Sequence, residues 1–202
     1  DHAAAIVCNP NNPTGRSYEV DALVDFAERC RDADATLVVD EAFLDFTDYT
    51  TMAEVPGTVV LRSLTKIFGL PGLRSGFAVA TGDLLDRLER ARASWAMSTP
   101  AADVGAHCLR QTQFVERVRE RTAEERERLR DALNERFDVL PSDAPYLLCR
   151  VRGESIDDVL EEARAAGIVI RDARTFRTLD EHLRVAVKRR HENRRLVDAL
   201  IR

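Results

Sequence analysis

The chain has 202 residues, of which 45% are hydrophobic and 32% are charged, and its formal net charge is -5. This composition is sufficient for a globular core, and the acidic balance argues against a nucleic-acid partner. No apolar run is long enough to span a membrane, so we expect no membrane partner either. The cysteines show no Cys-x-x-Cys spacing, which indicates reduced, mostly buried thiols in a cytoplasmic protein and no metal site.

The first predicted element is an apolar strand over Ala3–Cys8, which leads into the Asn- and Pro-rich loop N-P-N-N-P-T-G. Proline fixes the backbone, so the asparagine side chains of this loop project in set directions. The loop can form an Asx turn that caps the next helix, and it can also present an amide to a ligand. Both uses are compatible in one loop, with Asn11 and Thr14 making the turn.

A helix is predicted over Tyr18–Arg31 from apolar residues at helical spacing, and a buried strand over Thr36–Val39 follows it. An alternation of strand, helix and strand predicts a parallel sheet that binds ligands at the carboxyl ends of its strands. Asp40 stands at such an end. Its carboxylate can cap a local turn or contact a ligand, and the residues of this segment alone do not decide between the two.

After a strand over Thr58–Arg62 comes the stretch S-L-T-K-I-F-G-L-P-G-L-R-S-G-F. Apolar residues and glycines follow Lys66, and dry surroundings favour the neutral amine that forms a Schiff base with an aldehyde cofactor. Ser63 and Arg74 are a hydroxyl donor and a bidentate guanidinium, the residue types that hold a phosphate. Taken alone, the stretch fits a basic surface turn between two strands equally well.

The remainder predicts a strand over 77–80, a helix over 84–91, a long helical region over 101–137 and then a small α+β unit. In that unit we expect strands over 146–151, 168–170 and 183–187, a helix from Ile156 that ends near Gly167, and a closing helix over 192–201. A domain boundary is placed in or near the long helix, giving domains 1–110 and 111–202.

Three segments in this order resemble the class I/II aminotransferases, a family of fold-type I pyridoxal-phosphate enzymes: N-P-N-N-P-T-G, D-E-A-F, and S-L-T-K with its downstream G-L-R. The resemblance covers essentially the whole chain. It implies an α/β fold in which 1–110 is the C-terminal part of the large pyridoxal-phosphate-binding domain, a mostly parallel sheet with helices on both faces. Residues 111–202 would form the small α+β C-terminal domain. The resemblance also implies a homodimer.

The resemblance gives each motif residue a role toward the cofactor, pyridoxal 5′-phosphate. Lys66 would hold it as a Schiff base, and Asp40 would keep its pyridine nitrogen protonated, so that the ring withdraws electrons. Asn12 matches the asparagine that bonds the cofactor's phenolic oxygen, while Ser63 and Arg74 match the donors to its phosphate. The family's N-terminal portion is expected to be missing, so these residues are most of a cofactor site, and the fragment alone is expected to be inactive.

Arginines of the second domain match the family's substrate-binding positions. Arg184, in L-R-V-A-V, matches the arginine that grips the substrate α-carboxylate. Arg171, in V-I-R-D, lies where the subfamilies that act on phosphorylated substrates have an arginine near the substrate phosphate; a surface arginine in a short strand is the alternative. Two positions depart from the family pattern, Phe43 in place of Tyr and Pro145 in place of Asn.

The implied substrate is a phosphorylated amino acid or amino alcohol. Phe43 and the wording D-E-A-F-L-D-F resemble the threonine-phosphate decarboxylases of cobalamin biosynthesis more than ordinary aminotransferases. The alternatives are a histidinol-phosphate aminotransferase of histidine biosynthesis, another class I/II aminotransferase, and a non-catalytic fragment that keeps the fold.

Overall fold

The computed structural model describes residues 2–201, which divide into two compact units. The first unit takes in the chain up to Pro10 and Ser17–Val118, and the second takes in Asn11–Arg16 and the chain from Arg119 onward. The division between these units lies inside a long helix, α5 (Thr112–Leu133), and the domains 1–110 and 111–202 stay a prediction. Each unit is described by itself.

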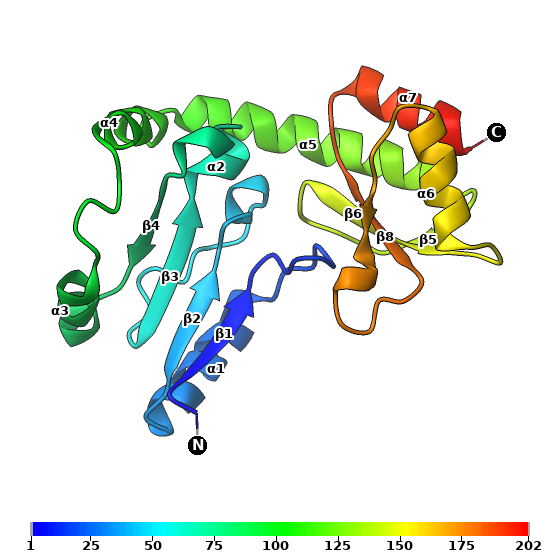
Figure 1. Ribbon diagram of the computed structural model, residues 1–202. Helices are drawn as coiled ribbons and strands as arrows, with labels where there is room; N and C mark the ends of the chain where they lie inside the picture. Colours follow the sequence, from blue (N-terminus) through cyan, green and yellow to red (C-terminus); the bar gives the residue numbers. More distant parts are fainter. Residues whose placement is uncertain (1, 202) are drawn as a thin grey trace. The chain divides into compact units, whose positions relative to one another are not determined.

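The first unit contains a sheet and the helices that connect its strands (Figure 1). Its elements are β1 (Ala4–Cys8), α1 (Val20–Asp32), β2 (Thr36–Asp40), a 3-10 turn (Leu44–Phe46), β3 (Thr58–Ser63), α2 (Leu64–Ile67), a second 3-10 turn (Pro71–Leu73), β4 (Gly76–Val79), α3 (Gly82–Ala91) and α4 (Thr99–Cys108).

The strands of this sheet follow the order β1-β2-β3-β4. β1, β2 and β3 run parallel, and β4 pairs with β3 in the antiparallel sense, with Ser63 opposite Gly76. Cys8 lies opposite Asp40 in the register of β1 and β2. The carboxyl ends of the parallel strands therefore meet at one edge, and this edge carries Cys8, Asp40 and Ser63, as the alternation of strands and helices predicts.

Helix α1 covers the sheet with the apolar stripe that its sequence spacing predicts. Leu23 and Ala27 are buried against Leu37, Val39 and Val60 of β2 and β3. Alternate residues of β2 point to opposite faces, so Leu37 and Val39 face the helix together. This packing fixes the strand that ends at Asp40.

The second unit is a small antiparallel sheet in the order β5-β6-β8-β7 with helices packed on it. Its elements are α5, β5 (Phe137–Val139), β6 (Tyr146–Val151), α6 (Ile156–Ala165), β7 (Arg171–Asp172), a 3-10 turn (Ala173–Thr175), β8 (His182–Ala186) and α7 (Arg190–Leu200). Leu133, Leu147, Val159, Leu183 and Leu200 are fully or almost fully buried in its core.

Two predicted elements were wrong in their extent. The helical region over 101–137 is two helices, because Arg110 and Gln111 donate to the carbonyls of His107 and Cys108 in a tight turn after α4. The strand over 168–170 does not form. The Ile168 amide instead donates to Ala163 O at 2.8 Å, which closes the end of α6, and the strand begins only at Arg171. Phe137, taken as the last residue of the helical region, belongs to β5.

Within the second unit, hydrogen bonds hold the loop Asn11–Arg16 against the segment 142–146. The Asp143 amide donates to Gly15 O at 2.7 Å, and the Tyr146 hydroxyl donates to Asn11 O at 3.0 Å. Gly15 has a φ of +74°, and a Cβ on it would lie 2.7 Å from the Cβ of Ser142 and overlap its Oγ. Ser142 is held in place, since its hydroxyl donates to Tyr146 O at 2.7 Å.

We therefore expect Gly15→Ala to lower the free energy of unfolding by about 2 kcal/mol or more, because overpacking adds to the strain of a left-handed backbone. Gly153→Ala is the matched control. Gly153 also has a positive φ, of +65°, but its position is open, so only the backbone strain remains. Denaturant titration of both variants measures the difference, and equal losses of stability would contradict the proposed clash.

Within residues 2–201, no helix combines the length and apolar character needed to cross a membrane.

Candidate active site

Ser63 and Lys66 lie where β3 passes into the short helix α2. Ser63 caps this helix, since its Oγ accepts a hydrogen bond from the Thr65 amide at 3.3 Å and lies 2.8 Å from Thr65 Oγ1. The strand end thus presents two neighbouring hydroxyls, one of which the sequence assigned to a phosphate.

Lys66 is exposed, so the described residues do not supply the dry surroundings that the sequence indicated. Its Nζ lies 5.3 Å from the centre of the Phe43 ring. Phe43 follows β2 by three positions, so this contact brings the segment after Asp40 next to the lysine. The contact is the most direct evidence that the D-E-A-F and S-L-T-K segments form one site.

Asp40 ends β2 and is half-buried. Its Oδ1 accepts a hydrogen bond from the Ala42 amide at 3.0 Å, and its Oδ2 lies 3.9 Å from the Cys8 thiol. The carboxylate therefore caps the turn after the strand with one oxygen. The other oxygen has a weak thiol contact and can also accept a hydrogen bond from a ligand.

Arg74 follows the 3-10 turn Pro71–Leu73 with a φ of +51°, and its side chain is exposed. The Leu64 amide donates to Ser75 O at 3.1 Å, so the backbones of Ser63 and Arg74 lie close together. The Arg74 guanidinium donates to Pro71 O at 3.4 Å. The structure thus places both predicted phosphate donors at the same edge of the sheet, with the arginine turned to its own loop.

In the second unit, Arg184 and Asn12 are in contact. Arg184 Nη1 donates to Asn12 Oδ1, and the guanidinium carbon lies 4.9 Å from the centre of the Tyr146 ring. Tyr146 in turn donates to Asn11 O. The asparagine predicted to bind the cofactor and the arginine predicted to bind the substrate are therefore joined directly, although they are far apart in the sequence.

Arg171 lies opposite Arg184 in the register of β7 and β8. Both guanidinium groups approach the Phe176 ring, whose centre lies 5.8 Å from the guanidinium carbon of Arg171 and 6.0 Å from that of Arg184. Burial lowers the pKa of Arg184, Tyr146 raises it, and the neighbouring charge of Arg171 lowers it further. Two positive charges side by side repel each other, so an anion bound here would be stabilised by both.

Tyr146 and Phe176 are site residues that the sequence did not single out. Tyr146 is buried, and its ring and hydroxyl fix Arg184 and the Asn11–Arg16 loop. For Phe176 the available signal was an aromatic residue between Arg171 and Arg184 in the sequence, whereas Tyr146 lies far from both arginines along the chain. Pro145, which departs from the family pattern, accepts the Val187 amide at 2.9 Å through its carbonyl and so anchors the end of β8.

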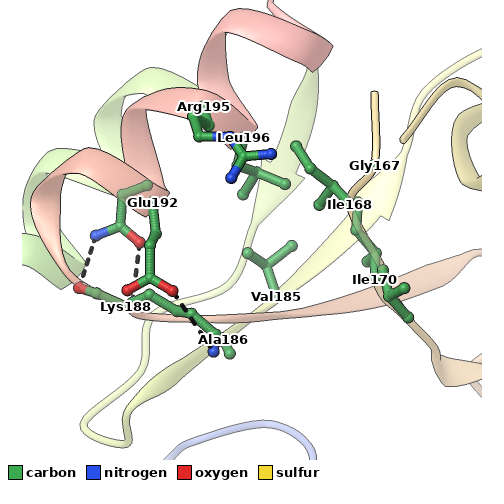
Figure 2. A pocket seen from close by; sticks show the side chains of 11 residues that line it. Gly167, Ile168, Ile170, Val185, Ala186, Lys188, Glu192, Arg195 and Leu196 are labelled. Atoms are coloured by element: carbon green, nitrogen blue, oxygen red, sulfur yellow. Dashed lines mark hydrogen bonds and ion pairs between the residues drawn. The ribbon is translucent and has the colours of Figure 1, made fainter. Parts of the chain in front are cut away.

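A separate pocket of about 320 Å³ lies between α7 and the loop before β7 (Figure 2). Ile168, Ile170, Val185 and Leu196 form its apolar wall, and Glu192 stands at its rim. None of the predicted site residues lines it.

Comparisons with known proteins agree with this geometry. A family model described as aminotransferase class I and II matches residues 2–200. Histidinol-phosphate aminotransferase 2 of Archaeoglobus fulgidus is 34% identical over 199 residues, covering 96% of this chain and 56% of that protein. The chain spans about half the length of the curated relatives it matches.

Solved structures of the same kind superpose closely. The histidinol-phosphate aminotransferase from Clostridium acetobutylicum gives a TM-score of 0.91 at 25% identity, covering 98% of this chain and 63% of that one. The L-threonine-O-3-phosphate decarboxylase from Porphyromonas gingivalis gives a TM-score of 0.86 at 25% identity, with the same shares of the two chains covered.

Proposed function

The chain belongs to the class I and II aminotransferase family, and on this premise we propose that the complete protein is a pyridoxal 5′-phosphate-dependent enzyme acting on a phosphorylated amino acid. The reaction we propose is decarboxylation of L-threonine O-3-phosphate, as in cobalamin biosynthesis. We also propose that the protein works as a homodimer in the cytoplasm, as its resemblance to the family implies.

The residues of the first unit fit this cofactor chemically. Lys66 offers an exposed amine for the aldehyde carbon, and Oδ2 of Asp40, which has only a weak thiol contact from Cys8, offers an acceptor for a protonated ring nitrogen. The Ser63 and Thr65 hydroxyls, with Arg74 nearby, are suitable donors to a phosphate. When bound, pyridoxal phosphate acts as an electron sink for the bonds at the substrate's α-carbon.

The residues of the second unit fit a substrate with two anionic groups. Arg184 would bind the α-carboxylate through its planar fork, and Asn12 holds that fork in place. Asn12 would also bond the cofactor's phenolic oxygen. Arg171 would bind the substrate phosphate beside it, since Phe176 lies against both guanidinium groups. A dianionic substrate would offset the repulsion between the two arginines.

The observation that carries the choice of decarboxylation is Phe43, whose ring lies against Lys66 where many family aminotransferases have a tyrosine. Its ring can pack on the cofactor site but cannot donate a hydrogen bond. In this reaction Arg184 would bind and orient the α-carboxylate, and Lys66 Nζ would supply the proton that replaces it on the substrate's α-carbon. The second candidate is histidinol-phosphate aminotransferase, which the 34% identical relative from Archaeoglobus fulgidus supports.

Assaying the complete protein with each substrate tests the proposal. We expect carbon dioxide to be released from threonine phosphate without any 2-oxo acid acceptor. Amino transfer from histidinol phosphate to 2-oxoglutarate, with no carbon dioxide from threonine phosphate, would establish the second candidate instead. A protein that binds pyridoxal phosphate but converts neither compound would point to another class I/II aminotransferase. Failure to bind the cofactor would leave a non-catalytic fold.

A further inference from the structure

Glu41 is a buried acid that the proposed chemistry does not use. It follows Asp40 directly, and its exposed fraction is 0%. One carboxylate oxygen accepts the Met52 amide at 2.7 Å. The other accepts the Thr51 hydroxyl at 2.6 Å and lies 3.4 Å from Nη1 of Arg62. Every partner is a donor, so the site is built for a carboxylate.

Arg62 extends this network across the sheet. It lies in β3 one residue before Ser63, and its other terminal nitrogen contacts Asp45 in the turn Leu44–Phe46. The backbone of Glu41 adds two bonds, since its amide donates to Leu61 O at 2.9 Å and its carbonyl accepts the Leu44 amide at 3.0 Å. The Glu41–Arg62–Asp45 network thus joins the ends of β2 and β3 to the turn that follows Asp40.

A buried ion pair of this kind is a poor way to gain stability. Removing charged groups from water costs free energy that their mutual attraction often does not recover. Burial raises the pKa of Glu41, while the hydrogen bonds from Met52 and Thr51 and the charge of Arg62 lower it. The hydrogen bonds of this network, however, are directional. They favour one arrangement of the ends of β2 and β3 and the turn after Asp40, whereas an apolar contact would tolerate several.

We infer that Glu41 is a positioning residue that fixes Asp40 and Phe43 relative to Ser63 and Lys66. The network acts on these residues through the backbone, because Asp40 directly precedes Glu41 and Ser63 directly follows Arg62. Phe43, between Glu41 and Asp45, meets the lysine at 5.3 Å. The inference rests on the proposed function, in which these residues hold the cofactor. It states that Glu41 sets their positions relative to one another.

The test compares Glu41→Gln with Glu54→Gln in the complete protein loaded with pyridoxal phosphate. Glu54 lies in the same loop and is exposed, so its substitution removes the same charge without breaking the network. In Glu41→Gln one of the two acceptor oxygens becomes an N–H donor, which faces either the Met52 amide or the Thr51 and Arg62 donors. We expect cofactor affinity to fall on the order of tenfold, as when outer partners are removed at metal sites, and the cofactor's absorbance titration with pH to shift. Glu54→Gln should match the wild type.

Thr51→Val provides a milder variant in case Glu41→Gln does not fold. It removes one of the bonds to the Glu41 carboxylate, together with the hydroxyl that accepts the Ala53 amide, and keeps the charge and the Arg62 contact, so a smaller change in the same direction is expected. Unchanged affinity and an unchanged absorbance titration in folded Glu41→Gln would overturn the inference, even if the variant were less stable.

A second measurement needs no cofactor. Hydrogen exchange of the Met52 and Leu44 amides should be faster in cofactor-free Glu41→Gln than in Glu54→Gln. The Met52 amide donates to the Glu41 carboxylate, and the Leu44 amide, which donates to the Glu41 backbone carbonyl, reports on the turn that the network holds. Equal exchange rates would overturn the inference. If the wild-type protein took up no pyridoxal phosphate, the proposed function would fail, and this exchange result alone would then decide on Glu41.

Discussion

Replacing Lys66 with alanine is expected to abolish covalent attachment of pyridoxal phosphate and to reduce turnover below detection in the complete protein. Lys66 would both hold the cofactor and move the proton at the substrate's α-carbon, and proton transfer alone is worth on the order of 10²–10⁴-fold in rate. The steady-state rate and the mass of the borohydride-reduced protein measure the two effects separately. Borohydride should fix the cofactor to Lys66 in the wild type.

The sequence supplies a matched control, because Lys66 and Lys188 are its two lysines. Lys188 is exposed and lies in the second unit, 3.9 Å from Glu192. Lys188→Ala should keep both cofactor attachment and turnover close to those of the wild type. Peptide mapping that found the reduced cofactor on Lys188 would overturn the assignment of Lys66.

The edge of the sheet that carries Asp40 and Ser63 could be predicted from the sequence because it depends on local patterns. Buried apolar runs ended by a polar residue specify both the strand and its end, and a helix between two such strands specifies their parallel pairing. The resemblance to a family then named Lys66 and Asp40 as partners. Their roles toward a cofactor stay a prediction, and the 5.3 Å contact between Phe43 and Lys66 brings the two segments together.

Features that depend on which of several possible contacts forms in the folded chain could not be predicted in the same way. The Ile168 amide closes α6, although the apolar run from Ile168 has the composition of a strand. Lys66 is exposed although its neighbours in the sequence are apolar, because the residues that pack around a side chain decide whether solvent reaches it. In the sequence, Glu41 is one letter of the D-E-A-F motif. Its burial and its bonds to Thr51 and Arg62 form only when the loop after β2 folds against β3.

The contact between Arg184 and Asn12 joins residues 172 positions apart, so it too could not be predicted from local patterns. Substituting Arg184 should have a large effect on catalysis. We expect Arg184→Ala to lower kcat/KM by roughly 30- to 5,000-fold, which corresponds to about 2–5 kcal/mol for leaving a desolvated carboxylate without its partner. Arg184→Lys should recover only part of this loss, because an ammonium group keeps the charge but cannot bind the carboxylate with two parallel bonds.

Arg150→Ala is the control for this substitution. Arg150 lies on β6 and forms an exposed ion pair with Glu181 at 2.8 Å, and surface pairs of this kind contribute little. It should leave kcat/KM near the wild-type value. Thermal unfolding of the variants then separates a folding defect from a loss of substrate binding.

Arg171→Ala distinguishes the two arginines by the part of the substrate that each would bind. If Arg171 binds the phosphate, its loss should weaken binding of threonine phosphate strongly and binding of unphosphorylated threonine hardly at all. Arg184→Ala should weaken both, because both carry the α-carboxylate. An Arg171→Ala variant that lost affinity for the two compounds equally would show that Arg171 supports Arg184 through Phe176 and does not contact the phosphate. Comparing the KM values of the two compounds in each variant therefore assigns each positive charge to one anionic group of the substrate.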